Sequence, residues 1–437
     1  MTATLPPTPS KRWRRLTAAL LLAPGFAGGL VAQPPEPEAK PDVRPPAGGP
    51  SAAAKPLTLG ECLAVAQGQQ PTIRAAYHSY LAGAAGSRAL GNLGPVANFL
   101  TPDLPIRKQQ AERGLTLGAA EIQKVTRETT QDVTVLYYSY VYARQQELTA
   151  TDIIDQLEIY YEIAEGIVKS GARDPKMRLN QFSLYALQNV ISEVKVQRLK
   201  AETGRRLALE ALRDAMGADG GFDFVPAAKE LPLMLSGVLT QEQVVAEALG
   251  RRPELAQAAA GVDAFRLEVC AQAAVKRGRQ VPTLASGSDL HSKQVPMAVR
   301  NGEYKPGALA PEMPASLVGT TEDRVARATE LSLRQDALYD RTASLIRLEA
   351  SKAYLTWDAA TRRVQEAKKK FERGRALVEE SRAAAIAKQD PEILVTNEAL
   401  AGKAQTEYVE AVFEHIKSLA ALERITAGGV VTQFPGR

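Results

Sequence analysis

The sequence predicts a mainly α-helical protein built from duplicated, long, antiparallel coiled-coil helical hairpins. Three observations lead to this prediction. A short segment at 57–71 recurs at 239–253. Long stretches without proline carry apolar residues at alternating spacings of three and four, as in a left-handed coiled coil. An Asp-Pro pair interrupts these stretches once in each half, at 174–175 and at 390–391.

Residues 1–32 have the pattern of an export signal. An apolar run from Leu16 to Ala32 follows a positively charged stretch and ends in a small residue suited to cleavage. An uncleaved anchor is the alternative, which Pro24 inside the run disfavours. We therefore expect a signal peptide over 1–32. The charges that precede the run are Lys11, Arg12, Arg14 and Arg15.

The charge of the exported part is close to neutral. The whole chain has a formal net charge of +5, and residues 1–32 carry four positive charges and no acid, which leaves about +1 (5 − 4). No basic patch therefore suggests a nucleic-acid partner. Charged residues make up 24% of the chain and no stretch reaches ~18 consecutive apolar residues, so a membrane-spanning helix is not expected.

Residues 33–56 contain eight prolines in 24 positions. Such a segment forms neither a helix nor a central strand, and we expect a solvated, disordered tether. Ordered sequence is expected to begin at Leu57.

The repeated segment is the strongest sign of duplication. Leu, Thr, two Ala, Gly and Pro coincide without a gap between Leu57–Pro71 and Leu239–Pro253. Each copy predicts a short helix with Thr as its N-cap and Gly at its end, followed by Pro at the start of the next helix. Chance similarity between two capped helices is the alternative. We divide the chain into a first repeat, 57–238, a second repeat, 239–428, and a tail, 429–437.

The long helices are expected over 122–170 and 340–388, each ~73 Å at ~1.5 Å per residue. Helices of this length must lie against partners. In the first half, a second row of apolar residues beside the coiled-coil seam predicts that the long helix has neighbours on two sides. The second-half seam is Val364, Ala367, Phe371, Gly374, Val378, Ser381 and Ala385, facing Tyr408, Val412, His415, Leu419 and Leu422. The first-half seam is Ile154, Leu157, Tyr161, Ala164 and Val168, and the second row is Ile153, Tyr160 and Ile167.

No residue pattern predicts an enzyme, a metal site or a cofactor. The three histidines, His78, His291 and His415, are scattered, and His415 falls within a seam, where a packed or interface side chain is expected. Cys62 and Cys270 either pair in an oxidising compartment or are two isolated small apolar residues, which we favour.

The chain resembles the TolC-like outer membrane efflux protein family over nearly the whole exported part. The resemblance rests on the doubled helix at 57–71 and 239–253, on Arg252-Pro253-Glu254-Leu255 before an Ala-rich helix that reaches Val281-Pro282-Thr283-Leu284, and on the closing stretch 419–428. It implies a homotrimer whose helices form a periplasmic tunnel continuous with an outer-membrane barrel. It also implies a periplasmic adaptor and an inner-membrane pump as partners.

The resemblance places the helical tips, where the adaptor docks, at the two Asp-Pro breaks. Asp174 and Asp390 either ring a narrow, cation-favouring entrance or cap the returning helices, and we favour capping. In the second half Ala387 or Lys388 replaces the family's tip glycine, so that the ordinary docking contact is in doubt there. The candidate tip residues are Gly171, Arg173, Asp174, Pro175, Lys388, Asp390 and Pro391.

The barrel strands should lie at 91–113 and 281–321, and both segments are poor strand sequences. Prolines interrupt them, and neither shows sustained alternation of apolar and polar residues. We expect a shortened or degenerate barrel portion, with irregular caps in these places.

Two functions from different classes follow. The first is a passive duct of a tripartite efflux or type I secretion system, which exports small molecules or polypeptides. The alternative is a periplasmic coiled-coil scaffold that has the same fold without the barrel. The transported substrate cannot be predicted from the sequence.

Overall fold

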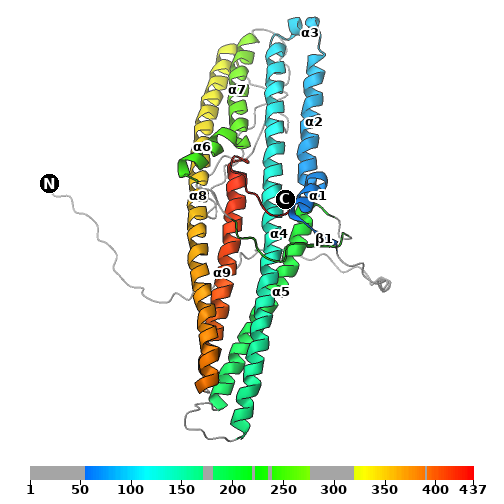
Figure 1. Ribbon diagram of the computed structural model, residues 1–437. Coiled ribbons are helices and arrows are strands. Elements are labelled where there is room, and N and C mark those ends of the chain that lie inside the picture. The colour runs from blue at the N-terminus through cyan, green and yellow to red at the C-terminus, as the bar shows by residue number, and fades with distance from the viewer. Residues whose placement is uncertain (1–54, 171–180, 219–221, 235–238, 276–318, 389–390) are drawn as a thin grey trace, which may run out of the picture. The chain divides into compact units, whose positions relative to one another are not determined.

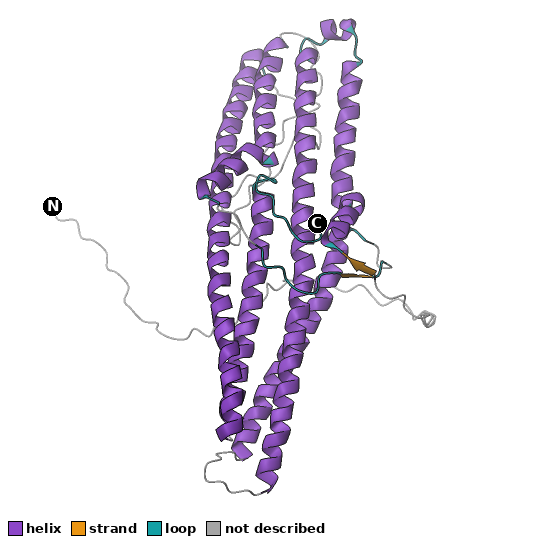
Figure 2. Ribbon diagram, viewed as in Figure 1, coloured by secondary structure: helices purple, strands orange, loops and turns teal. Residues whose placement is uncertain are grey.

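The computed structural model describes residues 55–170, 181–218, 222–234, 239–275, 319–388 and 391–437. Helices make up almost all of this part of the chain (Figure 2). None of the helices described is both long and apolar enough to cross a membrane. The elements, in chain order, are β1 (Lys55–Leu57), α1 (Leu59–Gln69), α2 (Pro71–Gly91), α3 (Pro95–Leu100), α4 (Leu104–Ser170), α5 (Gln181–Met216), β2 (Phe224–Pro226), α6 (Gln241–Arg251), α7 (Pro253–Ala274), α8 (Thr321–Lys388) and α9 (Pro391–Ile425).

The repeated segment forms the same structure twice. Thr58 and Thr240 are N-caps, and each forms a capping box with the side chain three residues later, Glu61 or Gln243. The threonine caps and the prolines at the first positions of α2 and α7 are therefore confirmed. The predicted glycine ends are wrong. Gly68 and Gly250 lie inside the last turn of their helices, which continue to Gln69 and Arg251.

Each half contains one long helix and one composite column of two shorter helices. In the first half α2 continues the line of α5 (Figure 1). The Gln70 side chain, before α2, donates hydrogen bonds to the carbonyls of Asp214 (3.3 Å) and Ala215 (2.9 Å) near the end of α5. Gly217, at φ +64°, permits this close approach, because an added Cβ would lie 2.8 Å from Gln70 Cα. In the second half α7 continues the line of α9 in the same way (Figure 1).

The four columns of the described chain form one layer in the order α2/α5, α4, α7/α9, α8 (Figure 1). The second apolar row of α4 contacts α9, where an added Cβ at Gly402 would lie 2.6 Å from Ile153 Cδ1. The rings of Tyr142 and Phe413 stack across the same contact with centroids 4.6 Å apart. The prediction that this helix has neighbours on two sides is confirmed.

The predicted seams pack within each half. Phe371 and Tyr408 stack between α8 and α9 at 5.5 Å, and an added Cβ at Gly374 would lie 3.3 Å from Ala401 Cα. In the first half Leu157 is buried with Leu187 and Ile191 of α5. The long helices are longer than expected. With 67 and 68 residues, α4 and α8 extend ~100 Å.

The extra length of α4 takes up part of one of the two segments for which the sequence predicted an irregular structure. Residues 91–113 form the end of α2, the short helix α3 and the first turns of α4, rather than strands or an irregular cap. Two of the three prolines that suggested breaks lie in first turns, Pro95 in α3 and Pro105 in α4, where a missing N–H costs no hydrogen bond. The third, Pro102, lies in the turn between α3 and α4. Most of the second segment, 281–318, lies outside the described residues, and Thr321 already begins α8.

The largest hydrophobic core lies about halfway along the bundle. Besides the helices, it includes residues of β1, of β2 and of the C-terminal segment. β1 and β2 pair in parallel with Pro56 opposite Val225. The segment 429–437, which the sequence analysis set aside as a tail, packs into this core through Phe434, which is 4% exposed and contacts the ring of Tyr138. Near its end, the Gly436 carbonyl accepts a hydrogen bond of 2.7 Å from Gly60 N.

Candidate functional site

The two outer columns present apolar side chains away from the layer. At ~3.5 residues per turn, Tyr185, Val196 and Leu199 lie on the face of α5 opposite to the one that packs on α4. Each of the three is at least 49% exposed. Leu348 and Leu355, at 43% and 57%, lie likewise on the face of α8 opposite to its buried seam. Both edges of the layer are therefore suited to further helix packing.

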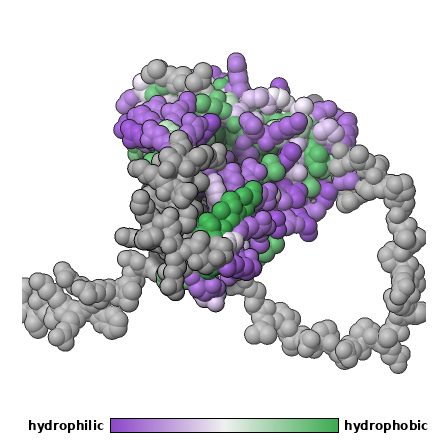
Figure 3. All heavy atoms as spheres, turned by 60° about the horizontal axis from the view of Figure 1, so that its bottom comes forward, coloured by the Kyte–Doolittle hydropathy of each residue, from purple (hydrophilic) through white to green (hydrophobic). Residues whose placement is uncertain are grey.

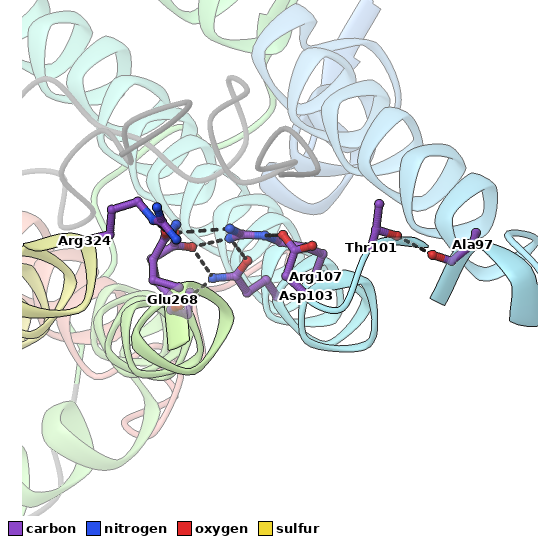
Figure 4. Close-up of polar contacts among 9 residues, drawn as sticks. Ala97, Thr101, Asp103, Arg107, Glu268 and Arg324 are labelled. Carbon is purple, nitrogen blue, oxygen red and sulfur yellow. Dashed lines mark hydrogen bonds and ion pairs between the residues drawn. The ribbon is translucent and has the colours of Figure 1, made fainter. Parts of the chain in front are cut away.

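Near the α3 end of the bundle, a buried ionic cluster joins α4 to α7. The Arg107 guanidinium lies between the carboxylates of Asp103 and Glu268, and its Nη2 donates a 3.2 Å hydrogen bond to Glu268 Oε1 (Figure 4). Gln110 and Gln272 donate to the same Glu268 carboxylate, at 3.0 and 2.6 Å. We call these five residues the Arg107 clasp.

The first turn of α8 is tied to the Arg107 clasp. Arg324 Nε donates to Gln272 Oε1 at 3.1 Å, and its Nη2 donates to the Val275 carbonyl at 2.7 Å (Figure 4). The clasp therefore connects α4 with α7, and through Arg324 with α8. Its buried charges are paired, which is the condition under which such groups are tolerated in a protein interior.

A second buried ionic cluster, the Arg252 clasp, joins the second repeated segment to the long helices. Arg252 ion-pairs with Glu254 at 2.7 Å and with Glu349 of α8 at 3.0 Å. Glu349 also binds Arg424, near the end of α9, at 2.7 Å. The start of α7 is thereby held on the end of α9, which makes the composite column continuous.

One carboxylate in each clasp has a lowered pKa. Burial alone raises the pKa of Glu268, but hydrogen bonds from Arg107 and its charge outweigh burial and hold the pKa below the ordinary value. The same balance with Arg252 lowers the pKa of Glu254. The ion pairs of the clasps fix the register of the columns.

A cleft of about 810 Å³ lies at mid-height against α4. It is lined by α4, by the junction of α2 with α5, and by α8 and α9. Four of its lining residues are acidic, Glu128, Asp132, Asp214 and Glu414, and Lys417 is basic. Thr130 and Thr134 of α4 line a second, small pocket together with Phe434.

Two of the predicted tip residues belong to described helices, at the opposite end of the bundle from α3. Lys388 is the last residue of α8 and Pro391 the first of α9, so that Pro begins the returning helix as expected. The other five, Gly171, Arg173, Asp174, Pro175 and Asp390, lie outside the described residues. Figure 3, with the bottom of Figure 1 turned forward, shows polar side chains over much of the described surface and apolar side chains in several separate patches.

The cysteines and the seam histidine have no site around them. Cys62 is buried and Cys270 exposed, and they are not paired with each other. Burial raises the pKa of the Cys62 thiol to about 12, so the nucleophilic thiolate is suppressed. His415 is buried in α9, and burial lowers its pKa. The described residues hold no His, Cys, Asp or Glu group placed to bind a metal ion.

Sequence reasoning missed both clasps. Arg252-Pro253-Glu254 was noticed as part of the resemblance, but its partners lie 97 and 172 residues further along, at Glu349 and Arg424. Arg107 and Glu268 carry no local signal, because each is one charged residue in a helix rich in them.

The chain is similar in fold to solved structures. No protein-family model matches it, and no curated protein matches it. The structural similarity is to long-helix membrane proteins at 11–15% identity, so it concerns the fold.

Three of these structures illustrate the likeness. The open-state outer membrane channel MtrE of Neisseria gonorrhoeae aligns with TM-score 0.65 and 14% identity, over 86% of this chain and 90% of that one. The outer membrane protein VceC of Vibrio cholerae aligns with TM-score 0.63 and 13% identity, over 85% and 96%. A membrane protein from Pseudomonas aeruginosa aligns with TM-score 0.65 and 11% identity, over 88% and 99%. The chain therefore has the fold of TolC-like outer membrane efflux channels, as the resemblance implied.

Proposed function

We propose that this chain is the duct component of an efflux or type I secretion system, anchored at the outer membrane and reaching into the periplasm. The observation that carries the proposal is the four-column layer with two unpartnered apolar edges, in a fold shared with channels such as MtrE. The duct is passive, and it exports small molecules or polypeptides without changing them chemically.

The working form is a homotrimer closed into a ring. The edge of α8 in one copy meets the α2/α5 edge of the next, which is a heterologous contact that closes by rotation. Three copies of the four columns enclose a tunnel with twelve columns in its wall. The exposed apolar side chains of α8 and of the α2/α5 column then pack against neighbouring copies, so that both apolar edges are covered.

The partners are a periplasmic adaptor and an inner-membrane pump. The adaptor docks at the hairpin end, at the tips near 171–175 and 387–391. The energy for transport comes from the pump. The clasps of this chain have a structural role.

The test is conductance in planar lipid bilayers with the purified full-length chain after export. A duct gives discrete conductance steps and a trimeric mass in detergent. The matched variant is Leu355→Arg, which places a charge at one edge of the layer and is expected to abolish the steps while the monomer stays folded.

A chain that is monomeric, needs no detergent and never conducts would contradict the duct. It would support the alternative of a periplasmic coiled-coil scaffold. Conductance that survives Leu355→Arg would leave the duct standing but would overturn the edge-to-edge ring.

A further inference from the structure

The α3 end of the bundle carries a small, strongly exposed apolar surface. Val96, Phe99 and Leu100 of α3 are 74%, 86% and 65% exposed, and Leu93, just before α3, is 43% exposed. Phe99 is the most exposed large apolar side chain among the described residues. Figure 1 shows α3 at the extremity of the layer, between the ends of α2 and α4. We call these four residues the apolar cap.

The apolar cap is held on a firm base. The Thr101 hydroxyl donates to the Ala97 carbonyl and Leu104 N donates to the Thr101 carbonyl at 3.0 Å, so the end of α3 is hydrogen-bonded. Below it Leu104 is fully buried, next to Asp103 of the Arg107 clasp. The apolar side chains therefore face outward because the backbone beneath them is fixed by buried contacts.

The segment that carries the apolar cap has exposed charges of one sign. Between residues 62 and 111 the only acid is Asp103, which is fully buried and paired with Arg107. The exposed Arg88 lies in the last turn of α2, and Lys108 donates a 3.1 Å hydrogen bond to the Leu93 carbonyl. Two basic side chains therefore flank the apolar ones.

Exposed apolar side chains flanked by basic ones are the combination that binds anionic lipid surfaces. The six residues of α3 are too few to span a bilayer, but three apolar side chains at its end reach the boundary between headgroups and acyl chains. The position at the extremity of a ~100 Å bundle lets this contact form without disturbing the columns.

We infer that the apolar cap is an interfacial anchor that seats this end of the bundle on an anionic lipid surface. Val96, Phe99 and Leu100 enter the lipid, while Arg88 and Lys108 contact the headgroup phosphates. The inference concerns lipid contact alone and does not require the chain to conduct.

The experiment is flotation of the full chain with vesicles made of equal parts phosphatidylglycerol and phosphatidylcholine, compared with pure phosphatidylcholine. The test variant is Val96→Ser/Phe99→Ser/Leu100→Ser. The matched control is Leu148→Ser/Leu400→Ser/Val431→Ser, which removes three exposed apolar side chains far from α3, on α4, α9 and the C-terminal segment.

The test variant is expected to lower the partition coefficient about tenfold or more, and the control to leave it unchanged. Arg88→Gln is expected to lower partition about fivefold on the anionic vesicles only. Equal flotation of the test variant and the wild type would overturn the inference. A wild type that does not bind the vesicles would also overturn the inference, and would favour a protein partner for the apolar cap.

Conductance separates this inference from the proposed duct. A chain that floats through the apolar cap but never conducts keeps the lipid anchor and loses the duct. A chain that conducts, and that floats equally well with or without the apolar cap, keeps the duct and loses the lipid anchor.

Discussion

Ile153 of α4 packs directly on Gly402 of α9, close enough that a Cβ on the glycine would lie 2.6 Å from Ile153 Cδ1. This contact joins the two halves of the chain, and Gln405 Nε2 supports it by donating to Thr149 Oγ1 at 3.1 Å. The halves therefore meet through a glycine whose missing side chain lets the two helices approach.

Gly402→Ala should be less stable than its matched control, Gly166→Ala. Both substitutions replace a helical glycine by alanine. This replacement alone stabilises a helix by roughly 0.5–1 kcal/mol. An added Cβ at Gly166 meets nothing within 4 Å, whereas at Gly402 it forces Ile153 to move. We expect a difference of about 1 kcal/mol or more in the free energy of unfolding, measured by denaturant titration. Equal effects would show that the interhalf contact is looser than described.

Glu268→Gln should destabilise the chain through the Arg107 clasp. The substitution removes the negative charge that Arg107 binds and leaves a buried guanidinium with Asp103 alone. Breaking a buried pair by removing one partner costs about 3–5 kcal/mol, and the remaining aspartate places this case near the lower end. The control is Glu247→Gln in the exposed pair with Arg251, where less than about 1 kcal/mol is expected. Equal losses in the two variants would mean that the clasp is hydrated.

The stability difference between wild type and Glu268→Gln should depend on pH. The folded-state pKa of Glu268 lies below its ordinary value of about 4.5. A lowered folded pKa stabilises the fold fully above the unfolded pKa, and this stabilisation is lost as the pH falls through the folded value. The difference should be constant near neutral pH and shrink below about pH 4.5. Denaturant titrations of both chains from neutral pH down to about pH 3 measure it, and a difference that grows on acidification would contradict the assigned pairing.

Local features of the fold could be predicted from the sequence because their causes are local. Thr58 and Thr240 cap helices through residues three positions away, and Pro391 begins α9 because proline suits a first turn. The row containing Ile153 predicted a second neighbour from spacing alone. It did not identify Gly402, since that glycine lies 249 residues further along the chain (402 − 153).

The mistakes have long-range causes. Pro95 and Pro105 can end a strand or begin a helix, and the sequence around them does not show that Arg107 pairs both with Asp103 and with Glu268 of α7. The ion pair of Arg107 with Glu268 spans 161 positions and has no periodic signal. The functional residues at the tips were placed by resemblance, and only Lys388 and Pro391 fall within the described chain.

Leu199→Arg and Leu355→Arg should each weaken the trimer without unfolding the monomer. Both leucines are 55–57% exposed and lie on the outer faces of the layer, so arginine costs little in a single chain but leaves a charge without a partner in a packed edge. Leu148→Arg on the central column α4, 53% exposed, is the control. Mass photometry in detergent should find monomers for the two edge variants and trimers for the control. Trimers in all three would place the subunit contact elsewhere.

The Asp174→Asn/Asp390→Asn channel should keep the ion selectivity of the wild type. Pro391 is the first residue of α9, and the sequence predicts that Asp390, just before it, caps this helix. Asparagine caps a helix about as well as aspartate, whereas alanine loses about 1 kcal/mol. Asp390→Ala should therefore reduce stability while the double Asn variant does not. Reversal potentials across a salt gradient measure the selectivity. A fall in cation preference in the double Asn variant would instead favour the charged ring, because only the ring depends on the negative charges themselves.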